Sequence, residues 1–367
     1  MAVQTLSLKG TNSADAASQA KKALQGQAPE VILFFASSSY NTSHPAEELK
    51  QAFPESTVIG CTSHSEFCNA DFTNGSFSIM AIDKETVEDI AVEVITDLDD
   101  PQAVVHAANA LHNHFGGTEA VFNHFDRYVG IILFESSAKA EETVMDRLGT
   151  ASDVLFVGGS SSAGDDGVSR VYADGKSYEK AAVLALLKTT KGYDILKTQS
   201  ASVFSERKLT ATKSDLKNRI LYEFDNRPCG EVYAEVLGVP VDQIQDYFVS
   251  NPLGVIADDE IFIRTFNEKS GDGITLHCGI AEGTEINVLK IGDIVDDTQK
   301  ALDKTISYEP AGVVNFNCLY RTLEIQNRKV EKPYCALFGR YPSIGFSTSG
   351  EAFLGHINET STVLVLK

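Results

Sequence analysis

The sequence predicts an α/β fold with mixed sheets, built from repeated strand–helix–strand–hairpin units and divided into two domains. Three observations support this prediction: the chain length, a pattern of apolar strand runs that occurs three times, and the spacing within that pattern. The 367 residues suggest roughly two domains. Apolar residues make up 43% and charged residues 22%, which is ordinary for a globular protein and enough for large cores without a disulfide or metal.

Each repeat begins with a short, continuously apolar run and ends with a glycine after a crossover. The runs begin at Val31, Val129 and Val313, and the closing glycines Gly60, Gly158 and Gly345 follow after 29, 29 and 32 residues. A connection of this length suits two parallel strands joined by a right-handed crossover. We expect helices at 45–53 and 140–148, whereas the third crossover carries a weaker helix pattern and is expected to be partly extended.

The first and third repeats also match beyond the glycine. IGCTSHSEF (59–67) is similar to IGFSTSGEAF (344–353), so Glu66 and Glu351 each stand six residues after the glycine. A further strand is predicted after each segment, at 76–82 and 361–366. The second repeat instead has GGSSSAGDDG (158–167), followed by a strand at 181–187.

Charge and composition exclude several classes of protein. With 31 Lys+Arg against 51 Asp+Glu, the net charge is −20, which argues against nucleic-acid and anionic-membrane partners because both are held by basic residues. No apolar stretch approaches the length that spans a bilayer, and the first residues do not read as a signal peptide. The six scattered cysteines indicate reduced thiols and a cytoplasmic location.

Several motifs, in this order, resemble the FIST sensory domain family of bacteria. In the first half they are VILFFASSS, VIGCTSHSEF and the pair Gly158-Gly159 with Asp165. In the second half they are DNRPCGEVYAEVLG, NPLG with Arg264, FNCLYR, and GFSTSGEAF with its trailing HINETSTVLVL. The resemblance implies a FIST N-like sensory domain at 1–225 and a FIST C-like domain at 226–367. One departure is His64, which stands where the family pattern has small residues.

The resemblance implies a non-enzymatic sensor of a small ligand that signals through a partner. We expect the partner to be a histidine kinase or a cyclic-dinucleotide signalling protein. One branch of the family is described as haem-bearing nitric oxide sensors, so haem b is the expected cofactor and nitric oxide the expected gas ligand. The alternative is a small polar metabolite such as an amino acid.

Candidate ligand residues come from the repeated turn and from the third repeat. Glu66 and Glu351 follow a strand and a small-residue turn, where a carboxylate can bind a ligand or cap its own turn. Arg321 offers a planar fork for a carboxylate or propionate, or else pairs with an acid of the protein. The set is completed by Gly159, Ser347, Thr348 and Asn358.

Haem iron needs an axial ligand, commonly an imidazole. His356 and His64 flank the repeated glutamate motif and are the candidates, with His277 in reserve; each is also compatible with an ordinary hydrogen-bonded histidine. An enzyme is the alternative from another class, because Cys61, His64 and Glu66 could supply a nucleophile, a base and an orienting acid.

Overall fold

The computed structural model describes residues 3–9, 12–40, 44–163, 167–257 and 260–367. Three repeat units form the main body, and each follows the order edge strand, helix, strand, crossover helix, strand, hairpin, strand. Unit 1 comprises β1 (Val3–Leu8), α1 (Ser13–Ala23), β2 (Val31–Ser37), α2 (Pro45–Ala52), β3 (Thr57–Ser63), β4 (Glu66–Cys68), β5 (Asp71–Thr73) and β6 (Phe77–Ile82). Unit 2 comprises β7 (Val87–Ile95), α3 (Pro101–His114), α4 (Thr118–Phe122), β8 (Tyr128–Phe134), α5 (Glu141–Ala151), β9 (Phe156–Ser160), β10 (Val171–Ala173), β11 (Lys176–Tyr178) and β12 (Ala182–Thr189). Unit 3 comprises β13 (Tyr193–Thr198), α7 (Ile294–Thr305), β23 (Gly312–Cys318), α8 (Leu319–Asn327), α9 (Glu331–Phe338), β24 (Ser343–Thr348), β25 (Glu351–Phe353), β26 (His356–Ile357) and β27 (Ser361–Leu366).

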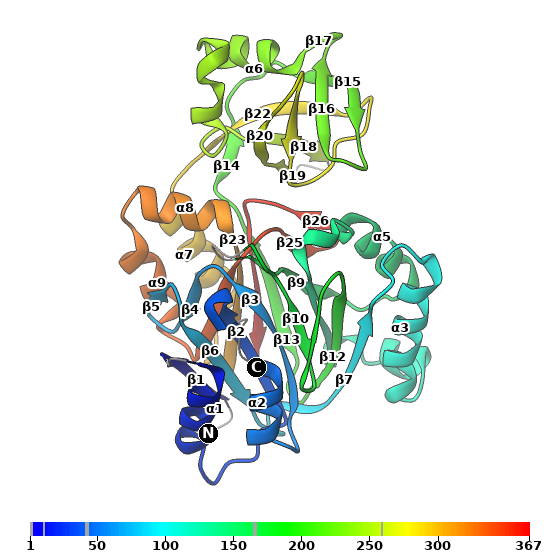
Figure 1. Cartoon of the computed structure of the whole chain (residues 1–367), viewed down its shortest axis with the longest axis vertical. Helices are drawn as coiled ribbons and strands as arrows, with labels where there is room; N and C mark the ends of the chain where they lie inside the picture. The colour runs from blue at the N-terminus through cyan, green and yellow to red at the C-terminus, as the bar shows by residue number, and fades with distance from the viewer. Residues whose placement is uncertain (1–2, 10–11, 41–43, 164–166, 258–259) are drawn as a thin grey trace.

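A fourth body, the inserted unit (residues 201–291), interrupts unit 3 between β13 and α7. Figure 1 shows it stacked on one end of the main body, above α8 on one side and above β25, β26 and α5 on the other. Its strands form one nine-stranded sheet, with α6 packed against it. The nine strands are β14 (Ala201–Val203), β15 (Leu209–Asp215), β16 (Ile220–Phe224), β17 (Arg227–Pro228), β18 (Leu253–Ala257), β19 (Glu260–Arg264), β20 (Phe266–Ser270), β21 (Gly273–Leu276) and β22 (Glu285–Ile291). The helix α6 comprises Cys229–Leu237.

The three units are interlocked by a cyclic exchange of hairpins. Their sheets have equivalent strand orders: β1-β6-β2-β3-β10-β11, β7-β12-β8-β9-β25-β26 and β13-β27-β23-β24-β4-β5. The hairpin of unit 1 thus joins the sheet of unit 3, that of unit 2 joins unit 1, and that of unit 3 joins unit 2. Removing any one unit would open an edge in another sheet.

Both faces of each sheet are covered. The largest apolar cluster combines inward residues of all three sheets, such as Leu33, Ile131 and Val314. The opposite faces pack against the helices of their own unit, as in the cluster of Ile132 with Val104 and Val144. Burial on both faces explains why the central strands are continuously apolar in sequence.

The repeated glycine is explained by close packing within the parallel strand pairs. In each unit the glycine faces one residue of the neighbouring strand, whose carbonyl oxygen would collide with a Cβ. The three pairs are Gly60 with Phe34, Gly158 with Ile132, and Gly345 with Asn315. A side chain at these positions would push the paired strands apart, so the repeat reports a real structural requirement.

The α/β class with repeated units and mixed sheets is confirmed. The expectation of a partly extended third crossover was wrong, because α8 and α9 fill it. The buried face of α8 carries Arg321, Thr322 and Glu324, so its apolar periodicity is masked in the sequence. Asp165 lies outside the described residues, and the boundary after residue 225 stays a prediction. Among the described helices, none combines the length and apolar character needed to cross a membrane.

Candidate functional site

Glu66 and Glu351 are buried and bind their own units. The first oxygen of Glu66 accepts the Ser63 hydroxyl, and the second accepts the backbone N–H and the hydroxyl of Ser76, both at 2.9 Å. Glu351 repeats this pattern with Thr348 and with the N–H and hydroxyl of Thr360 at 3.1 and 2.8 Å. Burial raises the pKa of each carboxyl to about 7 although these hydrogen bonds lower it.

These contacts match the capping role that the sequence left open for the two glutamates. Other predicted ligand residues are also held by the protein: the Ser347 hydroxyl lies 2.7 Å from that of Thr322, and a Cβ at Gly159 would lie 2.7 Å from Thr348. All of them lie where the three units meet, since the Ser347 N–H donates to the Ser65 carbonyl of unit 1. A ligand role for this group stays a prediction.

Arg321 is the largest fully buried side chain among the described residues, at 1% exposure. Its Nε donates to Asn317 Oδ1 at 3.1 Å and its Nη2 to Thr298 Oγ1 at 2.9 Å. Within the described part of the chain, Nη1 has no hydrogen-bond partner, and the guanidinium forms no ion pair within 4.0 Å. A buried cation normally has an anionic partner, and no described residue supplies one within bonding distance of Nη1.

Glu359, which precedes β27, lies close to this guanidinium. It is 2% exposed, and neither carboxylate oxygen meets hydrogen-bond geometry with another described residue. Burial raises its pKa well above the usual range; Arg321 and the nearby Thr265 hydroxyl oppose this, whereas Glu324 and Glu351 add to it. Thr265 belongs to the inserted unit, so this carboxylate faces the seam between the inserted unit and the main body.

The segment leading to Glu359 adds two more buried polar atoms. The Oδ1 of Asn358 and the Nε2 of His356 are without partners among the residues that the structure describes. A Cβ at Gly350 would lie 2.8 Å from His356 Nε2 and 3.2 Å from Asn358 Nδ2, so these two side chains share one small space. Together with Arg321 and Glu359 they offer a cationic donor and anionic or neutral acceptors at one seam, which is the chemistry that a zwitterion requires.

Sequence reasoning found Arg321 and Asn358 but missed Glu359 and Thr265. The available signal for Glu359 was its position in HINETSTVLVL, directly before the residue that Glu351 caps. Thr265 carries no such signal, because its place at the seam depends on how the inserted unit packs.

The three candidate iron ligands do not form a haem pocket. His64 is half-buried in the turn after β3. His277 Nε2 lies 3.1 Å from the Tyr320 hydroxyl, and burial lowers the pKa of His277 to about 4. Besides burial, the charges of Glu141, Glu142 and Arg219 act on the pKa of His356, whereas a porphyrin needs an apolar slot. These surroundings do not fit haem.

Cys61 lies in the central core with zero exposure. Burial and the nearby Glu66 raise its pKa well above the usual value, which disfavours the thiolate that a nucleophile needs. All six cysteines are free and buried. The predicted alternative of a Cys-dependent enzyme therefore gains no support from the geometry.

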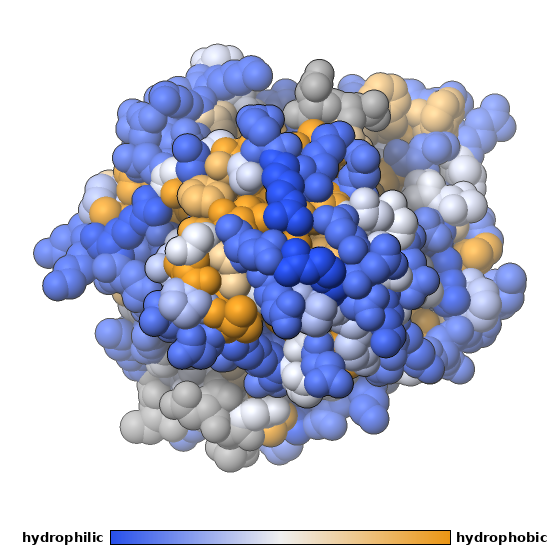
Figure 2. All heavy atoms as spheres, turned by 90° about the horizontal axis from the view of Figure 1, so that it is seen from above, coloured by the Kyte–Doolittle hydropathy of each residue, from blue (hydrophilic) through white to orange (hydrophobic). Residues whose placement is uncertain are grey.

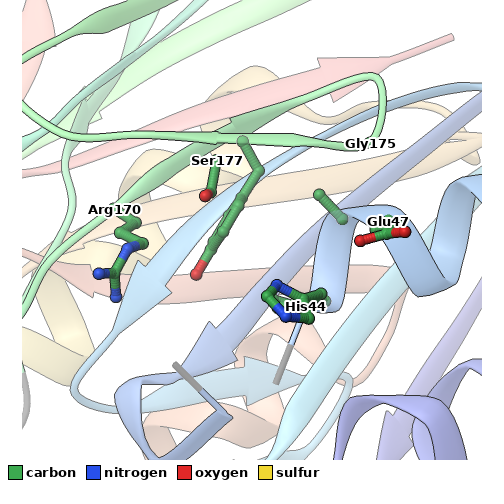
Figure 3. A pocket seen from close by; sticks show the side chains of 8 residues that line it. His44, Glu47, Arg170, Gly175 and Ser177 are labelled. Carbon is green, nitrogen blue, oxygen red and sulfur yellow. The ribbon is translucent and has the colours of Figure 1, made fainter. Parts of the chain in front are cut away.

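Several clefts among the described residues lie away from this site. A cleft of about 870 Å³ in the inserted unit lies at the N-terminal end of α6 and is lined by Lys213, Lys269 and Ile274, among others. Another of about 490 Å³ lies in the main body beside Tyr193. The view onto the inserted unit is mainly hydrophilic, with apolar side chains gathered in patches between the polar ones (Figure 2). A smaller pocket of about 150 Å³ lies between α2 and the β10–β11 hairpin, with Arg170 and Glu47 on opposite sides (Figure 3). Arg170 is already paired with Glu179 at 2.6 Å.

Fold and site together define an α/β protein of three interlocked units with a buried polar site under an inserted unit. The chain belongs to the FIST family: the FIST N domain model matches residues 30–227, and the FIST C domain model matches residues 230–353. FIST domains are sensor domains of signal transduction that bind small ligands. The two matches meet inside the inserted unit, at the start of α6.

A comparison with curated proteins finds no match. Among solved structures, the chain is similar to a cyanuric acid hydrolase from A. caulinodans. The two share 9% identity, the alignment covers 100% of this chain and 98% of that one, and the TM-score is 0.38.

Proposed function

We propose that this chain is a non-enzymatic cytoplasmic sensor of a small zwitterionic metabolite such as an amino acid. The observation that carries the proposal is the pair of buried groups Arg321 Nη1 and Glu359 at the seam, neither of which meets hydrogen-bond geometry with another residue in the part of the chain that the structure describes. A ligand carboxylate would accept from the Arg321 guanidinium, and a ligand ammonium would donate to Glu359. Each group would thereby gain a directly bonded partner of opposite charge.

Signalling would follow from the position of the site. Thr265 comes from the inserted unit, whereas Arg321 and Glu359 come from unit 3, so a ligand that touches all three favours one placement of the inserted unit. Only such a difference in contacts between two conformations can shift their populations. The partner that reads this shift is a histidine kinase or a cyclic-dinucleotide signalling protein in our proposal.

The experiment is a thermal-shift panel of amino acids on the full chain. A ligand at 100 times its Kd stabilises the folded state by about 2.7 kcal/mol. We expect one amino acid to raise Tm, and its decarboxylated and deaminated analogues to fail, because each lacks one of the two charges. Arg321→Lys and Glu359→Gln should abolish the rise. Arg328→Lys is the matched control. Arg328 directly follows α8, the helix that carries Arg321, and its exposed side chain is paired with Glu324.

Two results would contradict the proposal: no response to any amino acid, or an equal response in the Arg321 and Glu359 variants. Haem-based nitric oxide sensing, which the family resemblance implied, does not suit the charged surroundings of His356. We therefore expect no sharp Soret band with haemin. A sharp band that shifts on addition of nitric oxide and is lost in His356→Gln would favour haem over the amino acid.

A further inference from the structure

A second polar cluster lies at the same seam, on the side of α5. Glu142 extends from α5 of unit 2, Cys278 follows β21 of the inserted unit, and His356 lies in β26 of unit 3. One potential ligand atom from each lies within 4.8 Å of the other two. Three segments that are far apart in sequence thus bring a carboxylate, a thiol and an imidazole together.

The imidazole has capacity for a further bond. His356 is 5% exposed, and its Nε2 has no hydrogen-bond partner among residues 3–9, 12–40, 44–163, 167–257 and 260–367. Most buried polar atoms in folded proteins are satisfied, so this atom calls for an explanation. Gly350 is part of it, because a Cβ there would occupy the space of the ring.

The carboxylate is held in place by its neighbours. Glu142 Oε1 accepts the backbone N–H of Gly279 at 2.9 Å, and Arg219 binds Oε2. Gly279 directly follows Cys278, so one turn of the inserted unit both supplies the thiol and fixes the carboxylate. Such outer contacts orient metal ligands and leave lone pairs on each carboxylate oxygen free for a metal.

The charges around the cluster include both signs. Arg219 pairs with Glu141 and Glu142, and Arg264 adds a second positive charge that acts on Cys278 and His356. When a metal binds, the Cys278 thiol releases its proton to solvent and bonds as a thiolate. The two arginines, two glutamates and the thiolate then carry one net negative charge, which favours a cation.

We propose that Glu142, Cys278 and His356 form a transition-metal site that takes Zn²⁺. A mixed nitrogen, sulfur and oxygen set is borderline in softness and suits Zn²⁺ better than Mg²⁺ or Ca²⁺, which prefer oxygen alone. Three protein ligands leave the fourth tetrahedral position for water or another donor. The ion would bond the inserted unit to units 2 and 3 and thereby fix its position on the main body.

The test uses Co²⁺ as a spectroscopic probe on the full-length, chelator-treated protein. We expect one equivalent of Co²⁺ to produce a thiolate-to-cobalt charge-transfer band together with the visible bands of tetrahedral cobalt, and Zn²⁺ to remove both. Cys278→Ser should abolish the charge-transfer band, and His356→Gln should weaken binding at least ~10-fold. Cys335→Ser is the matched control, because Cys335 is an equally buried thiol in α9, outside the cluster.

Absence of the charge-transfer band at stoichiometric Co²⁺, or its persistence in Cys278→Ser, would overturn the proposal. If that variant does not fold, X-ray absorption on the wild-type zinc complex decides: one sulfur ligand supports the site, and a shell without sulfur refutes it. Neither measurement depends on the amino-acid ligand, so the two proposals can fail separately.

Discussion

Glu66 and Glu351 occupy equivalent places in units 1 and 3 and make equivalent hydrogen bonds. Each accepts a hydroxyl from three residues before it, and each caps the N–H of the residue directly before the last strand of its unit. In unit 2, Glu135 accepts the N–H of Lys180 at 2.9 Å, which lies one residue earlier than the equivalent position, because the last strand of unit 2 begins at Ala182. Units 1 and 3 therefore share the same capped backbone group, whereas in unit 2 a carboxylate from another position binds the neighbouring N–H.

This equivalence predicts a shared pH dependence of stability. Burial raises the pKa of Glu66 and Glu351 from 4.5 to about 7 in the folded protein. The folded state therefore holds protons that the unfolded state has released, and stability falls as pH rises from about 4.5 to 7. The loss is on the order of 3 kcal/mol per carboxyl. Urea unfolding at pH 5 and pH 8 should show a clearly smaller loss in the Glu66→Gln/Glu351→Gln double variant.

Glu135→Gln is the control of opposite sign. Burial pushes the pKa of Glu135 upward, but bonds from Ser137, Ser169 and the Lys180 N–H outweigh it, so the pKa lies below 4.5. Its carboxylate stabilises the fold above pH 4.5, and this contribution is lost as pH falls through the lowered pKa. The variant should be less stable at pH 8 and keep the wild-type loss between pH 5 and 8. An unchanged pH dependence in the double variant would contradict the assignment.

Arg219 is predicted to provide the main ion pairs between the inserted unit and α5. It is 8% exposed and binds Glu141 at 2.7 Å as well as Glu142. Arg219→Met should cost about 3–5 kcal/mol at pH 7.5, because it leaves the buried carboxylate of Glu141 without its cation. Burial alone would raise the pKa of Glu141, but His356 and Arg219 lower it, so the difference from wild type should shrink below pH 4.5.

Urea unfolding measures the effect, and Arg227→Met is the matched control. Arg227 pairs with Glu235 on the open surface of the inserted unit, with 45% and 47% of the two side chains exposed. Such pairs contribute little. If the two substitutions lowered the free energy of unfolding equally, the ion pairs of Arg219 would not be the main electrostatic contact between the inserted unit and α5.

Tyr320 in α8 is predicted to stabilise the packing of the inserted unit against the main body. Its hydroxyl donates to the Phe266 carbonyl at 2.9 Å and therefore accepts the proton of His277 Nε2 at 3.1 Å. Tyr320→Phe removes both bonds, at a cost of about 1–3 kcal/mol. We expect faster proteolytic cleavage in the connections at 199–200 and 292–293. Tyr308→Phe, which loses a hydroxyl bond to Asp194 within the main body, should leave that cleavage rate unchanged.

The sequence revealed the units because their signals are local. The apolar runs, the crossovers and the glycine before each turn depend on residues within about 30 positions, as burial of a parallel pair requires. The hairpin exchange is not local: β4 carries no mark that it pairs with β24 rather than with β3. The site at the seam is not local either. The pKa of Glu359 depends on Thr265 and Arg321, which come from other parts of the chain.

The repeated glycine gives the most direct test of the three-unit architecture. A Cβ on Gly345 would collide with the carbonyl oxygen of Asn315 in the paired strand, so Gly345→Ala must push β23 and β24 apart. We expect a loss of about 1–3 kcal/mol, as for overpacked cores. Gly149→Ala is the control, because Gly149 lies in α5 with open space around it, and alanine there should gain up to about 1 kcal/mol of helix propensity. If the two substitutions changed the free energy of unfolding in the same direction, close strand packing would not be the reason for the glycine.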